Sequence, residues 1–139
     1  MAIGRKIVCA GVVICALLFT IAARASTEKV IAYYFHGTFR CYTCTNMEKY
    51  AREAIEADFK DALASGKLEF KSVNVEESQN EHYVNDYKLY TKTLLLSFVK
   101  DGKEVKTKNL DKIWEYARDK NKFMDYVIKE TRLFMEGAR

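Results

Sequence analysis

Two cysteines three positions apart, Cys41 and Cys44, stand between a stretch that favours a strand and a stretch that favours a helix. Residues 29–36, KVIAYYFH, are β-branched and aromatic, which is typical of a buried strand. Residues 44–64 repeat apolar side chains at steps of three and four, which predicts an amphipathic helix packed along one stripe. The cysteine pair is therefore predicted at a strand–helix junction, and this placement constrains the fold more than any other feature.

The rest of the chain continues this alternation of patterns. In chain order, the sequence predicts a strand at 68–75, a short helix at 80–90, a β-hairpin of 93–100 and 103–107, and a helix at 111–135 broken around 119–121. The Asp101-Gly102 turn is the strongest local signal, since this dipeptide favours two-residue hairpin turns. A strand–helix–strand opening requires a right-handed crossover and parallel pairing, whereas a hairpin is antiparallel. We therefore predict an α/β domain with a mixed sheet of four to five strands and helices on both faces.

A hydrophobic segment precedes this domain. Residues 7–23 are uncharged and mostly apolar, follow Arg5-Lys6 and end at Ala23-Arg24-Ala25. The run is longer than a usual secretory core of about 7–15 residues and shorter than the roughly 20 residues of a spanning helix. The sequence predicts that residues 1–25 are a signal peptide or a membrane anchor helix, and that residues 26–139 form the domain. Either reading places the domain outside the cytoplasm, in the periplasm or an equivalent compartment, secreted or tethered by its N-terminal segment.

Charge and motifs exclude several functional classes. The chain has 23 basic and 19 acidic residues, and the hydrophobic leader accounts for three of the basic ones and none of the acidic ones. The domain is therefore nearly neutral, and we expect no nucleic-acid partner. With 49% hydrophobic and 30% charged residues, it is predicted to be neither disordered nor a multispan membrane protein. No phosphate loop, flavin fingerprint or nicotinamide motif occurs, so we expect no cofactor.

The predicted position of the dithiol suggests its chemistry. A thiolate at a helix N-terminus lies against unpaired backbone N–H groups and the positive end of the helix dipole, which favour the ionised form. Cys41 would occupy that place, and Arg40 beside it would add a cation. Cys44, one turn further, lies on the same face and can close a disulfide. Cys41 is thus the candidate nucleophile and Cys44 the resolving thiol.

Other interpretations of these cysteines stay open. A C-x-x-C pair is also half of a zinc site, and Cys41, Cys44 and His36 could provide three ligands, but without a clear fourth ligand we predict no metal. A permanent disulfide is a further alternative, although a bridge across so short a loop removes little entropy from the unfolded chain. His36 could move a proton for the resolving thiol, or simply end its strand with a hydrogen bond to backbone. His82 is expected on a solvated helix face.

The element order and the segment FHGTFRCYTC resemble the thioredoxin superfamily over nearly all of residues 28–136. More narrowly, YYFHGTFRCYTCTNMEKYAREAI, VNVEESQN and YTKTLLLSFVKDGKEV are similar to the small exported thioredoxin-like family of ArsF-type nitrophenyl compound nitroreductase subunits. The resemblance implies a thioredoxin-like fold and a dithiol–disulfide cycle at Cys41 and Cys44. It also implies a link to arsenic resistance and to the reduction of nitro groups on aromatic arsenicals, with electrons drawn from a partner because no redox cofactor motif is present.

Three positions depart from the thioredoxin pattern. Arg40 stands where thioredoxins have a Trp before the first cysteine. Residues 32–35 contain no carboxylate, although thioredoxins bury one in the first strand behind the dithiol. Residues 91–93 contain no Pro in the loop that faces the dithiol, where thioredoxins have a cis-Pro. A trans loop is expected there, because a cis bond at a non-proline residue costs about 2.5–4 kcal/mol.

Several other side chains are assigned structural roles. Glu76-Glu77 is expected to be a solvated turn, and Phe39 and Tyr42 could form an apolar lip beside the dithiol. The remaining aromatic residues are expected in the core: Tyr33, Tyr34, Tyr83, Tyr87, Tyr90 and Trp114.

The predicted function is an exported thiol–disulfide oxidoreductase that works with a redox partner protein, for example a membrane electron-transfer protein. An arsenical or aromatic compound is a further possible substrate. The alternative is a non-enzymatic module that binds a soft metal or arsenite through the same dithiol. A third possibility keeps the disulfide permanently closed in a docking protein.

Overall fold

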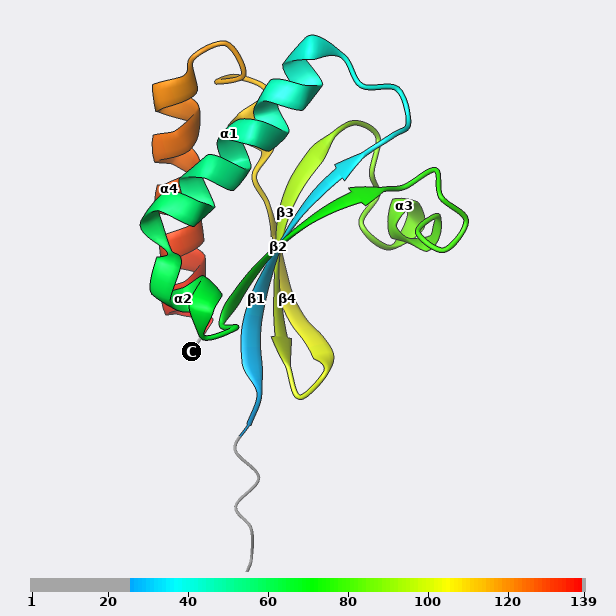
Figure 1. Cartoon of the computed structure of the whole chain (residues 1–139). Helices are drawn as coiled ribbons and strands as arrows, with labels where there is room; N and C mark the ends of the chain where they lie inside the picture. The colour runs from blue at the N-terminus through cyan, green and yellow to red at the C-terminus, as the bar shows by residue number, and fades with distance from the viewer. Residues whose placement is uncertain (1–25, 139) are drawn as a thin grey trace, which may run out of the picture.

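The strand β1 (Glu28–His36) lies inside a four-stranded sheet with the order β2-β1-β3-β4 (Figure 1). The computed structural model describes residues 26–138. The other elements are α1 (Tyr42–Asp58), α2 (Lys60–Ala64), β2 (Leu68–Asn74), α3 (His82–Asp86), β3 (Thr93–Lys100), β4 (Lys103–Asn109), the short 3-10 helix η1 (Asp111–Ile113) and α4 (Lys120–Gly137).

The sheet is mixed, as predicted. β1 pairs in parallel with β2, and Val30 lies opposite Leu68. On its other edge β1 pairs with β3 in the antiparallel sense, with Tyr34 opposite Leu94. β3 and β4 form the predicted hairpin, whose turn has positive φ at both Asp101 (50°) and Gly102 (78°). This order and these connections agree with the mixed α/β sheet predicted from the sequence.

Helices cover both faces of the sheet, which confirms that part of the prediction. α1 and α4 pack on one face, and α3 lies on the other (Figure 1). Successive residues of β1 alternate between two apolar clusters, because side chains of a strand point to opposite faces in turn. The larger cluster includes Val30, Ala32, Tyr34, Met47, Ile55, Leu94, Leu96, Phe123 and Val127. The smaller cluster consists of Ile31, Tyr33, Phe35 and Leu95, with Tyr83, Tyr87 and Leu89 packed against it.

Two predicted helices differ from the observed ones. The helix expected at 44–64 begins at Tyr42 and is broken at Phe59, where φ is −121° and ψ is 34°. The change of direction lets side chains of α2 pack against the larger cluster. The helix expected at 80–90 spans only His82–Asp86, because the positive φ of Lys88 (54°) ends it and brings Leu89 against the smaller cluster.

The C-terminal part agrees with its prediction only from Lys120 onward. The first part of the predicted helix, before the expected break at 119–121, forms only the three-residue η1, and residues 114–119 connect it to α4. The predicted signal peptide or anchor at residues 1–25 lies outside the described residues. Within residues 26–138, no helix has the length and apolar character needed to cross a membrane.

Candidate active site

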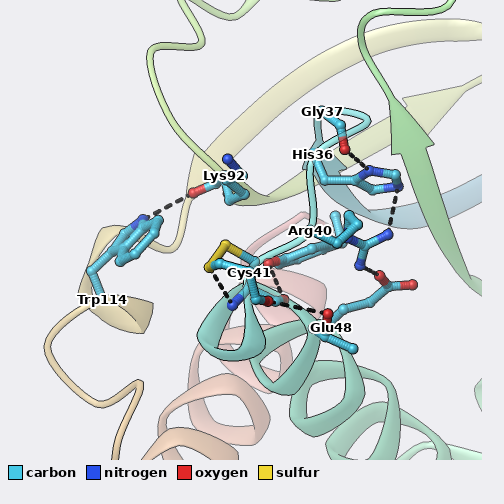
Figure 2. The surroundings of a disulfide bond; sticks show 10 residues. His36, Gly37, Arg40, Cys41, Glu48, Lys92 and Trp114 are labelled. Carbon is cyan, nitrogen blue, oxygen red and sulfur yellow. Dashed lines mark hydrogen bonds and ion pairs between the residues drawn. A yellow bond between two sulfur atoms is a disulfide. The ribbon is translucent and has the colours of Figure 1, made fainter.

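A disulfide joins Cys41 and Cys44 where the C-terminal end of β1 leads into α1 (Figure 2). Their Cα atoms are 5.0 Å apart. Cys41 is the N-cap of α1: its backbone is extended, and its Sγ accepts a hydrogen bond from the backbone N–H of Cys44 at 3.1 Å. A reduced Cys41 at this position would lie against the N–H groups of the first helical turn, which stabilise a thiolate.

The two sulfur-bearing residues differ in their access to solvent. Cys41 is half-buried, whereas Cys44 is 2% exposed and faces the core. A reagent or a partner thiol can therefore approach Cys41, while Cys44 is shielded by the rest of α1. In a thiol–disulfide exchange, the more accessible cysteine of such a pair is the one that an outside thiol or disulfide can meet first.

Tyr34 lies directly behind the dithiol. Its hydroxyl donates a hydrogen bond of 2.7 Å to the backbone carbonyl of Cys44, and the side chain is fully buried. Burial raises the pKa of Tyr34 far above its usual value, so the phenol stays neutral. A neutral hydroxyl thus occupies the strand position behind the cysteines. The alternation of β1 was the sequence signal that could have identified it, since Tyr34 falls on the face that α1 covers.

Arg40, which is expected to add a cation beside the thiolate, is held by side chains other than the cysteines. The Arg40 guanidinium forms an ion pair with Glu48 of α1, and its Nη1 lies 3.3 Å from Nε2 of His36. Figure 2 shows the guanidinium turned toward these two residues and apart from the sulfur–sulfur bond. Its charge is therefore compensated by a neighbouring carboxylate.

Glu48 is a site residue that sequence reasoning missed. Burial alone would raise its pKa, but hydrogen bonds from Arg40, Ser72 and Arg52 hold the pKa of Glu48 below its ordinary value. The carboxylate is thus ionised at neutral pH. Its position four residues after Cys44, on the same face of α1, was the available signal.

His36 ends β1 with a hydrogen bond to backbone. Its Nδ1 lies 2.9 Å from the carbonyl oxygen of Gly37, and its Nε2 faces Arg40. Both ring nitrogens therefore lie against groups other than the two sulfur atoms. Within residues 26–138, no group of three or more His, Cys, Asp or Glu side chains is arranged to hold a metal ion.

The loop between β1 and Cys41 is fastened from the end of β2. Oε2 of Glu76 accepts a hydrogen bond from the backbone N–H of Thr38 at 3.0 Å. A Cβ atom at Gly37 would lie 2.5 Å from Oε1 of the same carboxylate, so glycine permits this close approach. Glu76 is therefore more than the solvated turn residue that was expected: it is exposed but holds the loop that carries the dithiol.

A second loop faces the disulfide. Its Lys92 carbonyl accepts a hydrogen bond of 2.9 Å from the indole N–H of Trp114 (Figure 2). As expected for this loop without proline, its peptide bonds are trans, like all those of residues 26–138. Trp114 thus joins the segment after β4 to the start of β3, next to the dithiol.

Four exposed aromatic residues lie next to Cys41 in the chain or in the segments around the Lys92 loop. Phe39 and Tyr42, the predicted lip, are 77% and 84% exposed on either side of Cys41. Tyr90 and Trp114 were expected in the core, but they are 92% and 42% exposed, because both lie in connecting segments rather than on a packed face. Together these four residues form what we call the aromatic rim.

Solved structures similar to this chain include a thioredoxin from Fasciola hepatica, which is 24% identical, with 73% of this chain and 80% of that chain covered and a TM-score of 0.38. A cysteine-to-serine mutant of thioredoxin from Entamoeba histolytica is 25% identical, with 73% and 81% covered and a TM-score of 0.39. A structure described as a malarial protein is 16% identical, with 65% and 98% covered and a TM-score of 0.39. No family model and no curated protein matches the chain. The fold is therefore described from the sheet order of this chain, β2-β1-β3-β4, and from its connections.

Proposed function

We propose that this protein is a thiol–disulfide oxidoreductase that cycles Cys41 and Cys44 between the disulfide and the dithiol. The observation that carries the proposal is the asymmetric disulfide at the N-terminus of α1, where Cys41 is half-buried and accessible and Cys44 is buried. A purely structural bridge gains little from this position, because closing so short a loop constrains the unfolded chain only weakly.

The exchange proceeds in two steps. In the reduced protein, the Cys41 thiolate attacks one sulfur of a partner disulfide, forms a mixed disulfide and releases one partner thiolate. The Cys44 thiolate then attacks Sγ of Cys41, which closes the intramolecular disulfide and releases the second partner thiolate. Two electrons pass to the partner, and the reverse sequence returns them when a partner dithiol attacks the oxidised protein at Cys41.

The partner is proposed to be a protein that docks on the aromatic rim. Aromatic residues with large exposed area are typical of protein contact sites, and Phe39 and Tyr42 of this rim flank Cys41, the more accessible of the two cysteines. By resemblance, we propose further that the protein is exported and supplies electrons to the reduction of aromatic nitro or arsenic compounds by a partner that carries the necessary cofactor.

The test is a redox titration of the full chain. The protein is equilibrated in graded glutathione and dithiothreitol buffers and quenched with acid, and its free thiols are alkylated. Peptide mass spectrometry then separates Cys41 and Cys44 from Cys9 and Cys15, and Cys41→Ser serves as the control. We expect a midpoint between about −120 and −270 mV, the range of catalytic dithiols.

Two results would contradict the proposal. A midpoint below about −300 mV would indicate a structural bridge that the cell does not reduce. Thiols that resist alkylation until a chelator or a competing dithiol is added would indicate the non-enzymatic alternative, a module that binds a soft metal or arsenite.

A further inference from the structure

The Arg40–Glu48 ion pair lies beside the dithiol but takes no part in the exchange steps. Arg40 immediately precedes Cys41, and Glu48 lies one helical turn after Cys44 on α1. Their side chains are 30% and 16% exposed, so neither charge is fully solvated. A positive charge near a thiol favours its thiolate and a negative charge disfavours it. The balance within this pair therefore affects how much of the reduced Cys41 is ionised.

The contacts of the pair show that the Arg40 charge is directed toward Glu48 and away from the cysteines. Glu48 accepts from Arg40 and, at 3.3 Å, from Arg52. Among residues 26–138, Nε of Arg40 is buried and has no hydrogen-bond partner, so the guanidinium is fixed through its two terminal nitrogens alone. Those nitrogens point to Glu48 and His36 rather than to the sulfur atoms (Figure 2). Glu48 thus sets both the direction and the effective charge of Arg40.

We propose that Glu48 is a positioning residue that compensates Arg40 and thereby limits the thiolate fraction of reduced Cys41. The inference rests on the proposed function, since it concerns the reactivity of the same dithiol. Without the Glu48 charge, the Arg40 cation would stabilise the Cys41 thiolate and with it the reduced protein. The dithiol would then be a stronger oxidant and a weaker reductant.

The expected effect is moderate, because water reaches the pair. Arg40 and Glu48 line an open groove of about 420 Å³ together with Thr45, Lys49 and Arg52. Partly exposed charges in contact with solvent interact through a high effective dielectric, and their pairwise effects correspond to changes of about threefold in an equilibrium constant.

The test measures the alkylation rate of Cys41 against pH in the reduced full chain, with the label assigned by peptide mass spectrometry. For Glu48→Gln, we expect the midpoint of the profile to move to lower pH, with about threefold more thiolate below the midpoint. At a pH above the midpoint, where the reduced Cys41 is ionised, the equilibrium with glutathione should shift toward the reduced protein by about threefold, equivalent to about 14 mV at 29.6 mV per tenfold change.

Arg40→Met tests the same inference with the opposite sign. It leaves Glu48 compensated only by Arg52, so the midpoint should move to higher pH. The double variant Arg40→Met/Glu48→Gln should return toward the wild-type profile, because the two charges act on one thiol and their effects are coupled. A purely structural contact would not produce opposite shifts that cancel.

Glu53→Gln is the matched control, since it removes the same charge from the same helix. Glu53 pairs with Lys120 of α4, about three turns from the dithiol, and its removal should leave the profile unchanged.

Equal profiles for wild type and Glu48→Gln, or shifts in the same direction for Glu48→Gln and Arg40→Met, would overturn the inference. If Glu48→Gln fails to fold, as judged by circular dichroism, an unchanged profile in Arg40→Met overturns it alone. The wild-type midpoint potential tests the proposed function separately.

Discussion

Two residues near the dithiol, one neutral and one charged, interact with the segment that carries the cysteines. Tyr34 reaches the cysteines from the strand side and donates its hydroxyl to the Cys44 carbonyl. Glu48 lies on the helix side, where its negative charge pairs with Arg40, the residue before Cys41. The strand therefore contributes a fixed hydrogen bond to the start of α1, while the helix contributes the electrostatic component.

Tyr34→Phe should lower the free energy of unfolding by about 1 kcal/mol, because it removes a buried hydrogen bond and leaves the ring packing intact. Urea denaturation measures the change. Tyr42→Phe is the matched control: it removes a tyrosine hydroxyl from an exposed ring at the start of α1, and the stability should not change. Equal stabilities of Tyr34→Phe and the wild type would show that the Tyr34 hydroxyl contributes nothing to folding.

Only part of this site could be predicted from the sequence. The position of Cys41 and Cys44 at a strand–helix junction could be predicted, because their spacing and the patterns on either side are local features of the sequence. The Arg40–Glu48 pair and the contact of Glu76 with Thr38 could not, because they depend on how the end of β2 and the first turns of α1 come together around the loop. Partner choice for a charged side chain is a tertiary property, since Glu48 also has Arg52 within reach.

At the scale of elements, α1 depends on Cys41 for its start as well as for its chemistry. The Cys41 sulfur accepts the N–H of Cys44, which is one of the donors that a helix N-terminus leaves unpaired. The same atom therefore caps the helix and, in the proposed function, reacts with the partner.

A serine at this position should keep the cap, and an alanine should lose it. Under reducing conditions, where no variant has the disulfide, Cys41→Ala should be about 1 kcal/mol less stable than Cys41→Ser. Thermal or urea unfolding of the two variants measures the difference, and both should lack exchange activity. Equal stabilities would mean that the helix start is fixed by its packing alone.

The elements themselves were largely predictable, and their exceptions have tertiary causes. The β-branched run of β1 and the Asp101-Gly102 turn specify their structures locally, and the structure confirms both. The breaks at Phe59 and Lys88 interrupt sequence patterns that would continue as helices. They occur because the side chains that follow pack against the two apolar clusters, which local periodicity does not reveal.

The whole molecule contains two apolar clusters on opposite faces of one sheet, and each buries a tyrosine of β1. Burial raises the pKa of Tyr33 to about 12 and raises the pKa of Tyr34 still further. In the unfolded chain both would titrate near 10. The folded protein therefore keeps protons that the unfolded chain loses in alkaline solution, and unfolding becomes easier as the pH rises.

We expect the contribution of these tyrosines to stability to be constant below about pH 10. Between about pH 10 and 12, the free energy of unfolding should fall by about 1.4 kcal/mol per pH unit for each of them. Urea denaturation across this range measures the slope, and the near-ultraviolet absorbance of tyrosinate reports the ionisation. Tyr34→Phe should have a shallower slope than the wild type. If its slope is the same, the Tyr34 phenol ionises as readily in the folded protein as in the unfolded chain.

The start of β1 lies at the opposite end of the strand from the turn that leads into α1 and its disulfide (Figure 1). The nine residues of this strand extend over about 30 Å. Immobilisation through the N-terminal side, on a sensor surface, a resin or a bilayer, would therefore present Cys41 on the side facing away from the support. Coupling at the exposed Phe39 loop would instead place the support against the reactive sulfur and block it.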